Sequence, residues 1–135
     1  MFTEKEIAYL KSQRLARIAT VAPDGQPDVS PVGFEFDGAH FYVGGRDVTN
    51  TRKYKNVQAG HGKVALVVDD LQSVDPWRPR AVRVYGLAEL VEREGMLGPG
   101  EYMHITPQVS WSWGVEGPSL HRTVHEGYED LNPER

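Results

Sequence analysis

Residues 14–38, RLARIATVAPDGQPDVSPVGFEFDG, hold two strong turn signals separated by β-prone sequence. Asp24-Gly25 and Asp37-Gly38 are residue pairs that favour tight turns between antiparallel strands. The apolar residues just before the second turn recur at every second position: Val32, Phe34 and Phe36. That period places side chains on one face of a strand. The stretch therefore predicts a hairpin that continues, through the second turn, into a third antiparallel strand.

The flanking segments predict a short opening helix, a buried strand and a loop. Thr3, followed by Glu6, forms a capping-box pattern at the start of a helix over residues 3–13. Residues 62–71, GKVALVVDDL, contain a continuous apolar run that is typical of a strand buried on both faces. Residues 75–80, DPWRPR, predict a loop because proline cannot donate a hydrogen bond within a sheet.

Two further segments extend the predicted β-structure. Residues 81–92, AVRVYGLAELVE, alternate apolar and polar side chains, and Gly86 within them indicates a bulge or a barrel corner. Residues 101–117, EYMHITPQVSWSWGVEG, are aromatic and β-prone, with Pro107 as an interruption. The order of the segments favours an antiparallel meander over a sandwich built from repeats.

Length and composition point to one domain. A chain of 135 residues with 39% hydrophobic residues can build one core but not two comfortable domains. We therefore predict a single, mainly β domain over residues 1–135, an antiparallel barrel of six or seven strands with short helices. Its core is expected over residues 3–115, and residues 116–135 are expected to form a polar tail on the surface or on a partner.

Charge and residue usage exclude several classes of function. A formal net charge of -4 and a pI near 5.7 disfavour broad nucleic-acid binding. The absence of cysteine rules out disulfides and thiolate metal sites. No apolar run approaches the roughly 20 residues needed to cross a bilayer, and the charged N-terminal sequence does not resemble a signal peptide. We expect a cytoplasmic protein that binds neither membrane nor nucleic acid.

The histidines and paired aspartates do not indicate a metal site. His121 and His125 are four residues apart, as two ligands on one helical face would be, but no third ligand is evident. We interpret them as part of the solvated tail. Asp69-Asp70 lacks the spaced loop of a calcium site and is interpreted as a turn.

A cluster of positive charge stands out in this acidic chain. Residues 50–60, NTRKYKNVQAG, place Arg52, Lys53 and Lys55 on a predicted short helix, with Thr49, Asn50 and Thr51 as candidate capping residues. Hydroxyl donors and cations at a helix start favour binding of a phosphate group. The alternative, which the residues leave open, is a solvated helix face.

The order of these segments resembles the pyridoxamine 5′-phosphate oxidase-like split β-barrel superfamily, whose fold is FMN-binding-like. More narrowly, the chain resembles its flavin/deazaflavin oxidoreductases, which include coenzyme F420-dependent enzymes. The resemblance covers residues 3–115 and is most specific in ATVAPDGQPDVSPV and TRKYKN. It implies a homodimer with the cofactor in a groove between subunits. It also implies that Lys53 binds the cofactor phosphate, with Thr51, Arg52 and Asn56 as neighbours.

The same resemblance implies where the cofactor ring lies. The ring would pack against the start of a strand at Ser30, Pro31 and Val32, where proline limits strand pairing and favours an exposed edge. Trp77 or Trp113 would border the cofactor groove.

Function follows from the resemblance and from what the sequence lacks. No evident acid, base or nucleophile is present, as expected where a cofactor carries the chemistry. Arg46, Arg78 and Arg80 add positive charge beyond what one phosphate needs, which favours F420, with its acidic tail, over FMN. We therefore expect an F420-dependent oxidoreductase that transfers a hydride to an activated double bond of a small substrate. An FMN-dependent oxidase and a non-catalytic protein that binds a flavin-like or haem-like ligand are the alternatives.

Overall fold

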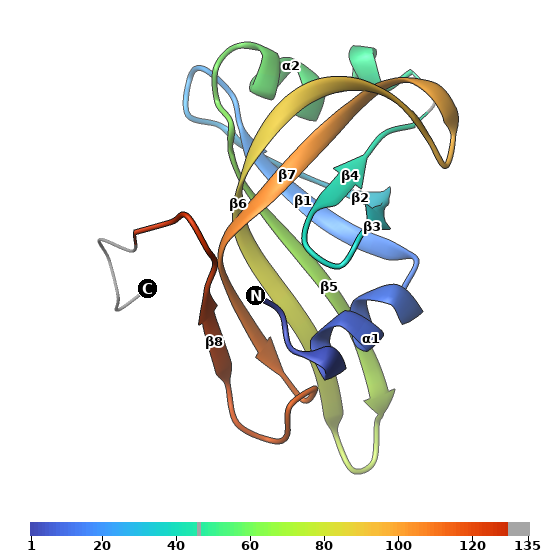
Figure 1. The fold of residues 1–135 in the computed structure, drawn as a ribbon, viewed down its shortest axis with the longest axis vertical. Helices are drawn as coiled ribbons and strands as arrows, with labels where there is room; N and C mark the ends of the chain where they lie inside the picture. Colours follow the sequence, from blue (N-terminus) through green and yellow to red (C-terminus); the bar gives the residue numbers. More distant parts are fainter. Residues whose placement is uncertain (46, 130–135) are drawn as a thin grey trace.

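Antiparallel strands dominate the computed structural model, which describes residues 1–45 and 47–129, and they curl around one core (Figure 1). The strands pair in the order β2-β1-β5-β6-β7-β4-β3, with β8 on the other part of β7. In chain order the elements are α1 (Glu4–Ser12), β1 (Leu15–Val21), β2 (Pro27–Gly33), β3 (Glu35–Phe36), β4 (Phe41–Val43), the 3-10 helix η1 (Val48–Asn50), α2 (Arg52–Gln58), β5 (Lys63–Ser73), β6 (Arg78–Gly95), β7 (Gly98–Trp113) and β8 (His121–Val124). The predicted antiparallel, mainly β fold is confirmed. The described residues form eight strands rather than six or seven.

Both turns of the opening stretch form where the sequence predicts them. Between β1 and β2, the backbone N–H of Gln26 donates to the Asp24 carboxylate over 3.1 Å. Between β3 and β4, the Asp37 carboxylate accepts from the backbone N–H groups of Ala39 and His40, at 2.9 and 2.6 Å. In each turn the aspartate satisfies backbone donors that the sheet cannot reach.

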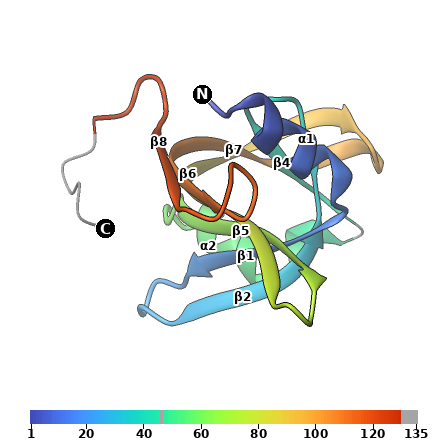
Figure 2. The same cartoon turned by 90° about the horizontal axis from the view of Figure 1, so that it is seen from below.

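The core is built from the inner faces of the strands and from the aromatic residues near the N-terminus. Phe41 on β4 is fully buried, and its ring lies 4.7 Å from that of Phe36 and 6.0 Å from those of Phe2 and Phe34. Alternate residues of β1, β5 and β6 complete the core: Ala16, Ile18, Val64, Leu66, Val68, Val82 and Val84. Figure 2 looks along the barrel from the end opposite α2 and shows how the strands curl around its interior.

The β5 strand differs from its prediction. Its side chains alternate between buried and half-exposed over residues 64–68 instead of being buried on both faces. Ala65 and Val67, the half-exposed members, point to the outside of the sheet. Apolar side chains on the outer face of a sheet indicate a surface that another protein chain can cover.

The predicted bulge at Gly86 is confirmed. The β6–β7 pairing slips between Tyr85 and Gly86, so that Gly86 faces Pro107. A Cβ atom at Gly86 would lie 2.8 Å from the Thr106 carbonyl oxygen, and only glycine permits this approach. Pro107 thus lies inside β7 without ending it. Pro79, predicted to lie in a loop, is likewise in β6, near the irregular end of its pairing with β5.

The C-terminal segment is ordered more fully than a polar tail would be. His121–Val124 form β8, which pairs with β7. His121 lies 3.4 Å from the fully buried carboxylate of Glu6, which also accepts a hydrogen bond from Ser112. His125, the residue after β8, is buried and hydrogen-bonds to Ser110 Oγ over 2.8 Å. The interpretation as solvated is therefore wrong for His125, whereas the side chain of His121 is 43% exposed. Residues 130–135 of the predicted tail lie outside the described residues.

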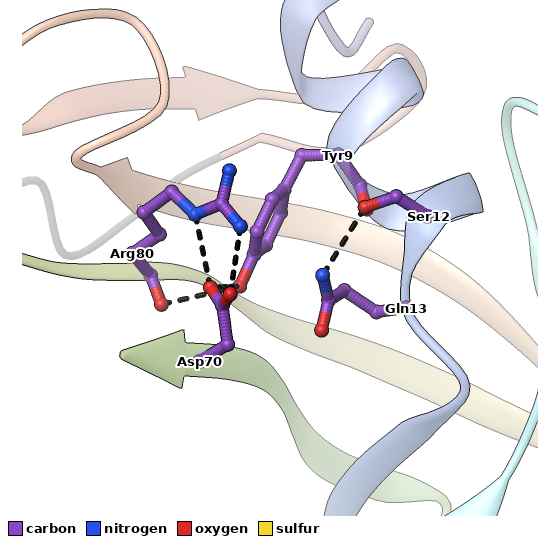
Figure 3. Close-up of polar contacts among 5 residues, drawn as sticks. All are labelled: Tyr9, Ser12, Gln13, Asp70 and Arg80. Atoms are coloured by element: carbon purple, nitrogen blue, oxygen red, sulfur yellow. Dashed lines mark hydrogen bonds and ion pairs between the residues drawn. The ribbon is translucent and has the colours of Figure 1, made fainter. Parts of the chain in front are cut away.

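The Tyr9 hydroxyl joins α1 to an ion pair within the β5–β6 hairpin (Figure 3). Arg80 donates from Nε and Nη2 to the two carboxylate oxygens of Asp70, over 3.0 and 2.7 Å. The Tyr9 hydroxyl donates to Asp70 over 2.9 Å and lies 3.2 Å from the Arg80 carbonyl oxygen. These hydrogen bonds hold the pKa of Asp70 below its usual value, with Arg80 as the larger cause. Asp70 is therefore a structural partner of Arg80, not a turn residue.

Removing the Tyr9 hydroxyl should weaken this junction. We expect Tyr9→Phe to lower the free energy of unfolding by about 1 kcal/mol, because Asp70 loses a hydrogen bond from a buried donor. Urea unfolding followed by circular dichroism measures the change. Tyr42→Phe is the matched control, since the Tyr42 hydroxyl has no hydrogen-bond partner among residues 1–45 and 47–129. Equal stability of Tyr9→Phe and the parent would contradict the role assigned to the hydroxyl.

Candidate functional site

Helix α2 begins at the predicted capping residue. Thr51 Oγ1 accepts from the backbone N–H of Tyr54 over 3.3 Å and donates to the Val48 carbonyl oxygen over 2.6 Å. The hydroxyl thus links the 3-10 helix η1 to α2. Because its proton is already donated within the chain, Thr51 shapes the turn rather than offering a free donor.

The cations of α2 are available to a ligand. Arg52 and Lys55 are exposed and Lys53 is half-buried. None of the three pairs with a carboxylate in the part of the chain that the structure describes. Arg46, the further cation predicted upstream, lies outside the described residues. Positively charged side chains without a carboxylate partner can form charge-assisted hydrogen bonds with an anionic ligand.

Asn56 attaches α2 to the sheet. Its side chain is fully buried, and Nδ2 donates to Thr20 Oγ1 on β1 over 3.0 Å. Its other side-chain atom, Oδ1, has no hydrogen-bond partner among the described residues. With no exposed surface, Asn56 fits a role in positioning the helix better than the direct phosphate contact expected from the resemblance.

Ser30, Pro31 and Val32 lie on β2, the edge strand next to β1. Val32 is buried in the core and Pro31 is exposed. Ser30 Oγ is buried and has no hydrogen-bond partner in the described part of the chain. Two residues earlier, Asp28 pairs with Thr20, the partner of Asn56. The structure therefore brings the predicted ring segment and α2 to neighbouring positions on the sheet.

Trp77 lies elsewhere. It is 68% exposed and follows β5, in the turn at the end of the barrel opposite α2 (Figure 1). The 11 residues of β5 separate the two ends by roughly 30 Å, at about 3.3 Å per residue. Arg80, also counted as a free cation from the sequence, is paired with Asp70. One chain therefore does not bring Trp77 or Arg80 together with Lys53.

Thr49 borders a small hollow that the sequence did not indicate. The hollow is about 240 Å³ in volume and lies between η1 and the tip of the β6–β7 hairpin, with Leu97 and Tyr102 among its lining residues. Asp47 and Glu101, two acidic residues, also line it. Met96 and Leu97 at the hairpin tip are each 66% exposed. The sequence feature that could have pointed to it is an apolar pair between glycines in an otherwise polar stretch, Gly95-Met96-Leu97-Gly98.

Within residues 1–45 and 47–129, no group of three or more histidine or acidic side chains is arranged to hold a metal ion. No helix among them is both long and apolar enough to cross a membrane. What the site region offers is unpaired positive charge, an exposed strand edge and buried hydroxyl and amide groups. Such groups bind and orient a ligand but do not supply a nucleophile.

Comparison with known sequences matches residues 2–109 to the model of the pyridoxamine 5′-phosphate oxidase family. The chain belongs to the pyridoxamine 5′-phosphate oxidase family. The matched segment includes Ser30–Val32, α2 and Trp77, and it ends before β8. The resemblance inferred from the sequence is thereby confirmed.

One sequence relative is a reductase, and two solved structures share the fold. The chain is 39% identical over 130 residues, 92% of its length and 90% of the relative's, to a 5a,11a-dehydrotetracycline/5a,11a-dehydrooxytetracycline reductase of Streptomyces rimosus. A solved F420 reductase superposes with a TM-score of 0.64 at 23% identity, covering 81% of this chain and 98% of that one. A conserved hypothetical protein of Mycobacterium tuberculosis gives 0.67 at 21% identity, covering 94% of each. The two structures support the split-barrel fold of the family, and the reductase relative supports an oxidoreductase.

Proposed function

We propose that this protein is an F420-dependent reductase that delivers a hydride to an activated carbon–carbon double bond of a small organic molecule. The observation that carries the proposal is the 39% identity, over 92% of the chain, to a reductase whose name specifies a dehydro substrate. Reduction of a dehydro compound adds a hydride and a proton across a double bond. A planar, conjugated ketone of the dehydrotetracycline type is the substrate class that this relative suggests.

The residues around α2 fit an anionic, phosphate-bearing cofactor. Arg52 and Lys53 carry charge that no carboxylate neutralises among the described residues, and the exposed Thr49 can donate a hydrogen bond. Ser30–Val32 offer an edge of β2 beside which a ring can pack. When bound, the deazaflavin supplies the hydride, and the protein's part is to hold the anionic chain, orient the ring and exclude water. FMN, which lacks the acidic tail, is the alternative cofactor.

We also propose that the protein works as a homodimer, with the cofactor in a groove between subunits. On the outer face of the sheet apolar side chains follow one another across paired strands: Val29, Ala19, Ala65 and Tyr85, with Val124 beyond Val109, which is already buried within the chain. Val29 is 68% and nearby Leu15 54% exposed. A second copy placed by two-fold symmetry would cover this face and the half-exposed residues of β5. Sedimentation that finds a monomer at micromolar concentration would count against the dimer.

Turnover tests the function. The purified protein is mixed anaerobically with reduced F420 and a 5a,11a-dehydrotetracycline, and the deazaflavin absorbance is followed. We expect F420 to be oxidised only when both protein and substrate are present. Parallel reactions contain reduced FMN instead, and simple conjugated ketones or quinones as other acceptors. Turnover with FMN alone would establish the alternative cofactor, and tight binding of a flavin or haem without any turnover would favour a binding protein.

A further inference from the structure

A second hollow lies at the end of the barrel away from α2. It is about 420 Å³ in volume and is formed by the turn after β5, the start of β6 and the segment after β7. Trp77, Arg78 and Trp113 are among its lining residues. Its volume falls within the range of roughly 300–1,000 Å³ that is usual for small-molecule sites.

The two tryptophans of the hollow differ from the third tryptophan of the chain, which packs against other side chains. Trp111 is 2% exposed, and its indole packs on the ring of Tyr85 and under the guanidinium of Arg83. Trp77, in contrast, is 68% exposed. Neither Trp77 nor Trp113 makes a ring contact with another aromatic side chain in the described part of the molecule. Trp113 is half-buried. Two indoles that border one hollow without a contact to another aromatic ring can offer apolar surface to a planar ligand.

Positive charge lies beside these rings. Arg78 is exposed, lines the hollow, and has no carboxylate partner within residues 1–45 and 47–129. Two residues later, Arg80 has its charge compensated by Asp70. A free guanidinium can pair with an anionic oxygen in a bidentate manner and can also stack on a flat ring. The combination selects for a ligand that is both planar and anionic.

The wall of the hollow is set by the backbone. Pro79 and Pro118 line it and restrict the conformations of their segments. Gly114 has a φ of +73°, and a Cβ atom there would lie 2.3 Å from the Pro79 carbonyl oxygen. The segment after β7 therefore packs closely on the start of β6 at a position that only glycine permits. A wall of this kind does not need to be organised by the ligand.

We propose that this hollow is a binding site for a planar aromatic anion, such as a fused-ring sulfonate, carboxylate or phenolate. The ring lies against Trp77 and Trp113, and the anionic group meets Arg78. Within one chain the site is separate from the α2 region. The proposal does not depend on the identity of the cofactor or on turnover.

The experiment compares a charged and a neutral probe of the same shape. The full-length protein is titrated with 8-anilinonaphthalene-1-sulfonate and with N-phenyl-1-naphthylamine, which lacks the sulfonate, and probe fluorescence is measured. We expect Trp77→Ala to weaken binding of both probes about tenfold, because a stacking surface is lost. Arg78→Gln should weaken binding of the sulfonate about tenfold and leave the neutral probe unaffected. Lys63→Gln, which removes an exposed cation at the other end of β5, is the matched control for net charge.

Three outcomes would overturn the proposal. The first is that Trp77→Ala and Arg78→Gln bind the sulfonate as tightly as the parent, which would assign the probe to another apolar surface. The second is that Arg78→Gln and Lys63→Gln have the same effect, which would reduce the role of Arg78 to net charge. The third is that F420 competes with the probe, which would make the hollow part of the cofactor site. Trp77→Phe, which keeps an aromatic face, should retain most of the affinity and serves if the alanine variant does not fold.

Discussion

The double variant Arg52→Ala/Lys53→Ala is expected to bind F420 about 100-fold more weakly than the parent. Each charge-assisted hydrogen bond to a phosphate or carboxylate is worth on the order of 1.5–3 kcal/mol, and 1.4 kcal/mol corresponds to tenfold in affinity. Removing two such hydrogen bonds together therefore weakens binding by about 100-fold or more, and removing either one by about tenfold. Fluorescence titration of the deazaflavin measures the dissociation constants. Higher salt should weaken binding to the parent more than to the double variant, because exposed charges are screened.

Controls separate binding from folding and from net charge. Lys11→Ala removes one exposed positive charge from α1, at the other end of the barrel, and should leave F420 affinity unchanged. The melting temperature of the double variant should stay close to that of the parent, since surface cations without a carboxylate partner contribute little to stability. If the double variant binds F420 as tightly as the parent while melting at the same temperature, the cations of α2 form only a solvated helix face. The assignment of the cofactor would then lose its main support from individual residues.

Acidification from pH 7 to pH 5 should destabilise the parent by about 2 kcal/mol more than the His125→Gln variant. Burial, with a smaller effect of the positive N-terminus, lowers the pKa of His125 to about 4, while Glu6 acts in the opposite direction. An unfolded histidine titrates near pH 6.5. Between these values the unfolded chain binds a proton that the folded chain does not, so stability falls as the pH decreases through this window. Urea unfolding at several pH values measures the free energies.

The glutamine variant isolates the titration of one group. Glutamine is neutral throughout the range and can still hydrogen-bond to Ser110, so acid-induced changes at other residues should be common to both proteins. The difference between the two pH profiles should therefore be small at pH 7 and should grow below about pH 6.5. Parallel profiles for parent and variant would show that His125 is protonated as readily in the folded state as in the unfolded chain.

Local signals in the sequence predicted local structure well. Asp24-Gly25 and Asp37-Gly38 form turns, Gly86 marks a bulge, and Thr51 begins a helix, each because a few neighbouring residues determine the backbone. Interactions between distant segments gave no such signal. The four residues of β8, three polar ones and a terminal valine, show no apolar alternation, and they form a strand because β7 presents an edge to them. The buried carboxylate of Glu6 accepts a hydrogen bond from Ser112, which is 106 residues away in the sequence.

The candidate site was predicted in part for the same reason. The cations of α2 are adjacent in sequence, so the sequence places them together without knowledge of the fold. Asn56 is next to them in sequence, but its side chain faces β1, because helical rotation turns it toward the sheet. Trp77 is only 24 residues from Lys53, yet the length of β5 carries it to the other end of the barrel. Distance along a chain that contains a long strand is a poor guide to distance in space.

The hydrogen bond between Glu6 and Ser112 also limits the order in which the chain can assemble during synthesis. The capping box of α1 needs only Thr3 and Glu6, so the helix can be nucleated as soon as it is made. The second carboxylate oxygen of Glu6 stays in water until Ser112 on β7 has been synthesised and paired. The first helix to emerge is therefore among the last elements to reach its final environment. Its docking on the sheet has to wait for most of the barrel.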